Sequence, residues 1–134
     1  MKLRSRPVPA WAKKVIAQVC TEEGIKEPRV TWQKVDRDQS SGMAWPYHFR
    51  ITAGNYKKEV KEVLLHELTH CVRGQSGASK GSRGHDAEFY ATLFRIAKRH
   101  QIGAAFIKRR EGWYKPRGIK QGYALYLRRL REGA

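Results

Sequence analysis

The sequence has few cysteines, few acidic residues and no long apolar run. Its two cysteines, Cys20 and Cys71, lie far apart, and neither belongs to a C-x-x-C pair. Neither a disulfide framework nor a cysteine zinc ribbon is therefore indicated, and a reducing compartment is favoured. No apolar stretch approaches about 18 residues, and Lys13 and Lys14 interrupt the apolar segment near the start. We therefore expect neither a membrane span nor a secretory leader.

The scarcity of acidic residues leaves a large positive charge. Only 12 Asp and Glu oppose 28 Lys and Arg, which gives a formal net charge of +16. The excess is concentrated in residues 95–134, which hold 12 Lys and Arg against two Asp and Glu. Such a field attracts polyanions, of which nucleic acid is the commonest, although a basic surface can also serve solubility alone. We expect contact with nucleic acid, DNA in particular, and a location in the cytoplasm or at the nucleoid.

The length and patterning of the chain predict one small α+β domain, which we expect to be a monomer. A chain of 134 residues is long enough to bury one substantial core. Apolar residues at three- and four-residue spacing predict a helix over 9–23, which Gly24 ends. Residues 29–35 and 45–54 have strand patterns, and the segment between them is rich in turn-forming residues. An antiparallel hairpin is the simplest interpretation.

The second half of the chain has the pattern of successive helices. A central helix is predicted between Asn55, a plausible N-cap, and Gly74, a plausible C′ residue. The glycine- and serine-rich segment 74–84 predicts a loop, and residues 86–100 predict another amphipathic helix.

The central helix contains the most informative motif of the sequence, "KEVLLHELTHCVRG". At 100° per residue its leucines and valines occupy one arc, whereas His66 and His70 share a face outside that arc. Two imidazoles one turn apart can bind a single zinc ion, and the intervening Glu67 can serve as general base, which is the geometry of H-E-x-x-H. The simpler alternative is a pair of histidines with ordinary polar contacts. We predict a Zn²⁺ site.

A catalytic zinc ion usually has three protein ligands and one open position. The metzincin arrangement, with Gly three and His six residues after the second histidine, is absent because Arg73 and Ser76 occupy those places. The segment "GHDAEF" offers His85 and Glu88, three residues apart at the start of the following helix. Either side chain suits zinc, so both stay candidates for the third ligand.

The combination of "HELTH", a short glycine-rich loop and "GHDAEF" resembles the SprT-like zinc metallopeptidases. These include the Spartan proteases, which act on DNA–protein crosslinks, and the WLM and YgjP-like families are similar. The resemblance implies a zincin-like fold with zinc ligands His66, His70 and His85. It also implies Glu67 as the general base and Phe89 as a packing aromatic.

The resemblance extends over residues 55–100 and suggests a division of the chain. We predict a SprT-like core over residues 1–100 and a basic helical extension over 101–134, packed on the same domain. Many bacterial relatives end in a cysteine-pair zinc ribbon, which this sequence lacks, and Asp86 replaces the residue that usually follows the third histidine.

The function that follows is a zinc metalloendopeptidase that cleaves proteins on or near nucleic acid. An extended peptide substrate is expected to add to the edge of the strand predicted over residues 45–54. One alternative is a nucleic-acid-binding protein with a structural, non-catalytic zinc ion. Another is zinc-dependent hydrolysis of a non-peptide amide or ester.

The basic C-terminal sequence mixes cations with aromatic residues, as backbone contact and base stacking require. The residues proposed to bind nucleic acid are Arg109, Arg110, Trp113, Arg128 and Arg129. The alternative is a final amphipathic helix with aromatic residues in the core and solvated arginines.

Overall fold

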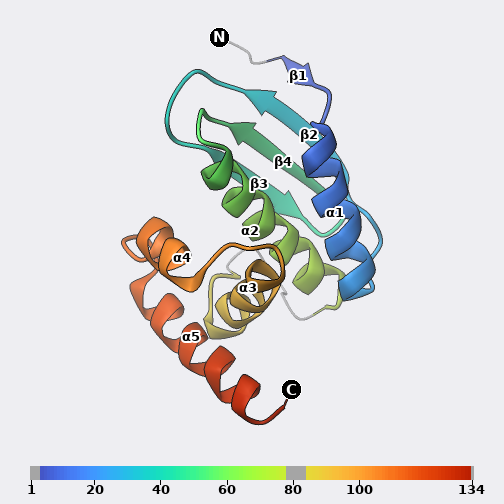
Figure 1. Ribbon diagram of the computed structural model, residues 1–134. Helices are drawn as coiled ribbons and strands as arrows, with labels where there is room; N and C mark the ends of the chain where they lie inside the picture. The colour runs from blue at the N-terminus through green and yellow to red at the C-terminus, as the bar shows by residue number, and fades with distance from the viewer. Residues whose placement is uncertain (1–3, 78–83, 134) are drawn as a thin grey trace. The chain divides into compact units, whose positions relative to one another are not determined.

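The structure, a computed structural model, describes residues 4–77 and 84–133. Within these residues it contains one four-stranded sheet and five helices, which confirms the predicted α+β class (Figure 1). The loop predicted over residues 74–84 lies partly outside the described residues.

The chain divides into two compact units, Met1–Ser79 (unit 1) and Lys80–Ala134 (unit 2). We predicted a division at residue 100 instead. By packing, helix α3 (Ala87–Arg99) belongs with the helices that follow it, because its apolar face lies against the last helix.

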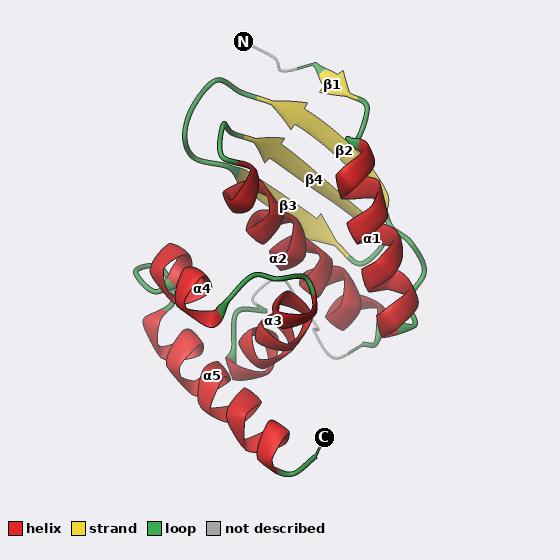
Figure 2. Ribbon diagram, in the orientation of Figure 1, coloured by secondary structure: helices red, strands yellow, loops and turns green. Residues whose placement is uncertain are grey.

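Unit 1 holds the whole sheet and two helices. Its elements are β1 (Ser5–Arg6), α1 (Ala10–Glu23), β2 (Arg29–Lys34), β3 (Ser41–Trp45), β4 (His48–Ala53) and α2 (Lys57–Gln75). The strand order is β1-β2-β4-β3 (Figure 2). Strands β2 and β4 are parallel, whereas β1 pairs antiparallel with β2 and β3 pairs antiparallel with β4.

The predicted hairpin between β2 and β4 is therefore wrong. These two strands run side by side in the same direction, and the hairpin is formed by β3 and β4. The segment that we interpreted as a turn includes the start of β3. Strand β4 is the most apolar strand, and its Phe49 and Ile51 are fully buried. It lies between β2 and β3 because a strand with neighbours on both sides buries its side chains best.

Helices α1 and α2 lie on the same face of the sheet (Figure 1). The core of unit 1 forms between them and the sheet. Trp32 of β2 packs edge-on against Trp11 of α1, with ring centroids 6.1 Å apart. The fully buried leucines of α2 point to the same core and are Leu64, Leu65 and Leu68.

The predicted end of α1 is confirmed, whereas both predicted ends of α2 differ from the structure. Gly24 ends α1 in a left-handed conformation with φ of 65°, as expected for a glycine after a helix. Asn55 is not the N-cap of α2, because Tyr56 occupies that position. Gly74 lies inside α2, and a Cβ atom there would be 2.9 Å from Pro46 Cγ. Gly74 therefore allows a close approach of chain segments instead of ending the helix.

Unit 2 consists of three helices. These are α3, α4 (Ala104–Glu111) and α5 (Pro116–Arg131), and α3 packs mainly against α5. The two helices approach closely at Gly122, where a Cβ atom would lie 2.4 Å from Tyr90 Cβ. Among the described residues, no helix combines the length and apolarity that crossing a bilayer requires.

Candidate metal centre

The two histidines of the H-E-x-x-H motif lie together on α2. Their ring centroids are 5.1 Å apart and the rings are inclined by 64°. Both side chains are half-buried, whereas the leucines on the opposite arc are fully buried. The amphipathic pattern of α2 thus buries one side of the helix and leaves His66 and His70 accessible as a pair.

Glu67 is buried and its carboxylate lies beside strand β3. Its exposed fraction is 6%. A Cβ atom on Gly42 would be 2.6 Å from Glu67 Cγ and 2.7 Å from Glu67 Oε2. With any other residue at position 42, the Glu67 side chain or β3 would have to shift, because real Cβ atoms do not approach other atoms so closely. The sequence interpretation missed Gly42, since its segment has the composition of a turn.

Strand β3 is held along α2 at both of its ends. At one end the Ser40 N–H donates to Glu59 Oε1 over 2.9 Å, and Glu59 is in the first turn of α2. At the other end Cys71 Sγ donates to the Trp45 carbonyl over 3.2 Å, and Gln75 Nε2 donates to the Pro46 carbonyl over 2.9 Å. These bonds fix the register that brings Gly42 to the motif glutamate.

The Cys71 thiol is part of this packing. Burial, and next the negative charge of Glu67, raise the pKa of Cys71 to about 12. Burial likewise raises the pKa of Cys20 to about 11. Both thiols are free and stay protonated at neutral pH, which suits packing and not metal ligation or nucleophilic chemistry.

His85 is set in an aromatic environment in unit 2. Its ring lies 5.1 Å from the Phe89 ring and 5.8 Å from the Tyr114 ring, both nearly perpendicular to it. The His85 carbonyl is close to α5, because a Cβ atom on Gly118 would lie 2.6 Å from it. Aromatic contacts on two sides restrict the orientation of the imidazole.

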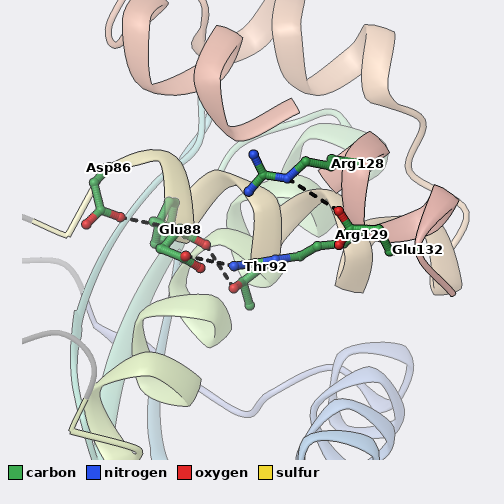
Figure 3. A network of polar contacts seen from close by, with 7 residues as sticks. Asp86, Glu88, Thr92, Arg128, Arg129 and Glu132 are labelled. Carbon is green, nitrogen blue, oxygen red and sulfur yellow. Dashed lines mark hydrogen bonds and ion pairs between the residues drawn. The ribbon is translucent and has the colours of Figure 1, made fainter. Parts of the chain in front are cut away.

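The two acidic residues that follow His85 have structural partners. Asp86 is the N-cap of α3, and its carboxylate accepts the Phe89 N–H over 2.9 Å. Glu88 accepts a hydrogen bond from Arg129 Nη2 over 2.7 Å (Figure 3). The ion pair gives Glu88 a role in joining α3 to α5.

Unit 1 holds two of the three ligands that the sequence resemblance implies, His66 and His70, side by side on α2. The third, His85, belongs to unit 2. Within unit 2, Glu88 is already paired with Arg129. A set of three imidazoles suits zinc.

His48 is engaged elsewhere in unit 1. It lies on β4, next to Trp45 of β3, with the two rings stacked at 5.2 Å. Its Nε2 is 3.0 Å from Thr31 Oγ1, so the ring is hydrogen-bonded within the sheet. This agrees with its interpretation as an ordinary strand residue.

The residues proposed to bind nucleic acid have unequal surroundings in unit 2. Trp113 is 81% exposed, and Arg109 is exposed with its guanidinium 5.7 Å from the Phe106 ring. Arg110 is half-buried. Arg128 lies 3.8 Å from a Glu132 carboxylate oxygen, and Arg129 is paired with Glu88 (Figure 3).

No protein-family model, curated protein or solved structure matches the chain.

Proposed function

We propose that the chain is a zinc-dependent metalloendopeptidase of the SprT-like type, with a zincin-like unit 1. The observation that carries the proposal is the placement of Glu67. Its side chain is buried where the H-E-x-x-H helix packs on the edge strand β3, and Glu67 stands between the two accessible histidines in the motif. A buried carboxylate at this position of the motif is what a general base beside a zinc ion requires.

The zinc ligands in this proposal are His66, His70 and His85. Three neutral imidazoles leave one position of a tetrahedral zinc ion open, as hydrolysis requires. When bound, zinc supplies a Lewis acid and activates water near neutral pH. In this proposal Glu67 would be the general base, which would take a proton from the attacking water and deliver it to the leaving nitrogen.

The substrate strand is proposed to bind at β3. We expected this role for the strand over residues 45–54, but β4 is paired on both sides and offers no edge. Strand β3 is the last strand of the sheet, and Gly42 in its middle lies beside Glu67. An extended peptide that adds to the outer side of β3 would pass close to the general base.

The charge of the chain supports substrates on or near nucleic acid, DNA in particular. Unit 2 has 14 Lys and Arg against four Asp and Glu. A positive field of this kind concentrates the enzyme on polyanions. The intracellular location stays a prediction.

The decisive experiment compares the parent with Glu67→Gln on casein, with and without single-stranded DNA, together with zinc analysis. The variant is expected to keep its zinc and its fold and to lose about 10²–10⁴-fold in cleavage rate. Glu22→Gln, which changes an exposed glutamate of α1, is the matched control and should cleave like the parent.

The same experiment tests the alternative of a nucleic-acid-binding protein with a structural zinc ion. A parent that contains zinc and binds DNA but cleaves no protein would support that alternative. Small esters tested beside casein distinguish a non-peptide hydrolase.

A further inference from the structure

Helices α1 and α2 cover one face of the sheet of unit 1, and no described helix of that unit lies on the opposite face, which we call the open face (Figure 2). Residues paired across a sheet point to the same side, so the register defines which side chains share this face. Buried Trp32, Phe49 and Ile51 belong to the helix side. The open face is formed by three rows: Arg29, His48 and Trp45; Thr31, Arg50 and Met43; Gln33, Thr52 and Ser41.

The open face carries positive charge without acidic residues. None of its nine side chains is Asp or Glu, whereas Arg29 and Arg50 occupy adjacent rows. Arg37 reaches the last row, because its Nη2 donates to Ser41 Oγ over 3.3 Å. Burial, and next the charges of Arg29 and Arg50, lower the pKa of His48, so both arginines act at this face.

The open face also presents an ordered aromatic surface. Trp45 is 46% exposed and is stacked on His48 at 5.2 Å, with an angle of 10° between the rings. The hydrogen bond between His48 and Thr31 holds the imidazole of this pair in place. Tyr47, in the adjoining turn, is 57% exposed. A large aromatic ring that is exposed and has a neighbouring ring stacked on one side is suited to stack on a planar ligand.

We propose that the open sheet face binds single-stranded nucleic acid, with a base stacked on Trp45 and backbone phosphates on Arg29 and Arg50. A single strand fits both features, because it offers unpaired bases beside negative charges. A duplex hides its base faces, and an acidic peptide lacks planar rings, so each would use the arginines without Trp45. This site does not need zinc or the proposed peptidase activity.

The test is fluorescence anisotropy of a labelled oligothymidylate with the full chain. Trp45→Leu is expected to weaken binding about 5- to 100-fold, as loss of one stacked base does. Trp45→Phe, which keeps a ring, should restore most of the affinity. Arg29→Gln with Arg50→Gln should weaken binding and reduce the slope of log K against log salt by about 1.4, since each phosphate contact contributes about 0.7 on a single strand.

The matched control is Tyr56→Leu, which removes another exposed aromatic of unit 1, 56% exposed and outside the open face. It should bind like the parent, and thermal unfolding should show that all variants are folded. Unchanged affinity of Trp45→Leu would overturn the proposal. Equal loss with a duplex or with polyglutamate would also overturn it, because the ligand would then not be a single strand. Failure of the peptidase proposal would show in casein cleavage and would leave these results unaffected.

Discussion

The two units carry equal numbers of cations but use their carboxylates differently. Each has 14 Lys and Arg, whereas unit 1 has eight Asp and Glu and unit 2 has four. In unit 1, Glu59 binds the start of β3 and Glu67 lies beside its middle. The carboxylates of α2 therefore position a strand and supply the candidate chemistry.

In unit 2 every carboxylate takes part in local packing. Each of the four acidic residues has a partner within the unit, in the pairs Asp86 with the Phe89 N–H, Glu88 with Arg129, Glu111 with the Tyr90 hydroxyl, and Glu132 with Arg128. The cations of unit 2 outnumber its acidic residues by ten, whereas in unit 1 they do so by six. The proposed chemistry thus depends on a carboxylate of unit 1, and the proposed attraction to polyanions depends chiefly on unit 2.

The largest effect is expected from removing a proposed zinc ligand of unit 1. His70→Ala removes one of the paired imidazoles and should reduce zinc from about one ion per chain to almost none, with loss of cleavage. Elemental analysis after gel filtration measures the content. His48→Ala, a histidine of the same unit on the open sheet face, should keep its zinc. A His70→Ala protein with full zinc would exclude the proposed ligand set.

The next effect is expected from displacing Glu67, the proposed general base, while leaving every proposed zinc ligand unchanged. In Gly42→Ala the new methyl group would meet Glu67 Cγ at 2.6 Å, so the carboxylate or β3 must shift. A misplacement of about 1 Å can cost about 10²-fold in rate, so kcat should fall by that order while zinc content is unchanged.

The matched control for this change is Gly103→Ala in unit 2. A Cβ atom at Gly103 meets nothing within 4 Å, and its φ of −75° suits alanine. Its kcat should equal that of the parent, although alanine at this N-cap position of α4 should lower stability slightly. If Gly42→Ala also cleaved at the parental rate, the contact between Gly42 and Glu67 would have no catalytic role.

A smaller effect is expected on DNA binding, and it should differ between two arginines of unit 2. Arg109→Ser should flatten the salt dependence of duplex DNA binding by about 0.9, the contribution of one phosphate contact. Arg129→Ser should change the slope less, because Arg129 is already paired with Glu88. Titrations at several salt concentrations measure both slopes. Equal slopes for both variants would show that the ion pair opens when DNA binds.

The smallest effect concerns the two buried thiols of unit 1. Their raised pKa values, about 11 for Cys20 and about 12 for Cys71, mean that the folded chain keeps these protons after the unfolded chain has lost them. Their contribution to stability is therefore complete below about pH 9 and is lost as the pH rises toward 11–12. Urea unfolding from pH 8 to 11 measures the decline, which Cys71→Ala should reduce.

The pKa of the Cys71 thiol also depends on the charge of Glu67, so its reactivity can be used to detect a change at that carboxylate. Because the charge of Glu67 helps to raise the pKa of Cys71, Glu67→Gln should lower that pKa and modestly speed the reaction of Cys71 with a disulfide reagent at alkaline pH. Cys20 serves as the internal control, since its pKa depends on burial and Glu27 instead. An equal change in both thiols would indicate general loosening of unit 1.

Local patterns were sufficient for the helices and for part of the site. The spacing of apolar residues predicted α1 and α3 to within one residue at each end, and the cap at Gly24 followed from its sequence position. The pairing of His66 with His70 is equally local, because one helical turn separates them. Helix geometry repeats every 3.6 residues, so neighbours along the chain determine which side chains share a face.

Strand pairing and the surroundings of Glu67 could not be predicted in this way. The parallel pairing of β2 with β4 depends on which strand buries the most apolar surface, and that competition involves distant segments. Gly42 and Gly74 have the sequence appearance of turn and cap residues, yet each makes room for a residue at least 25 positions away. Such contacts require the folded chain.

The sequence by itself determined the helical motif, the paired histidines and the excess of positive charge, because each depends on residue identity or on spacing within a few turns. The tertiary structure decided that β3 is the edge strand, that Glu67 lies against Gly42, and that Trp45 shares an open sheet face with Arg29 and Arg50. The physical reason is that side chains far apart in sequence are brought together only by burial of the common core.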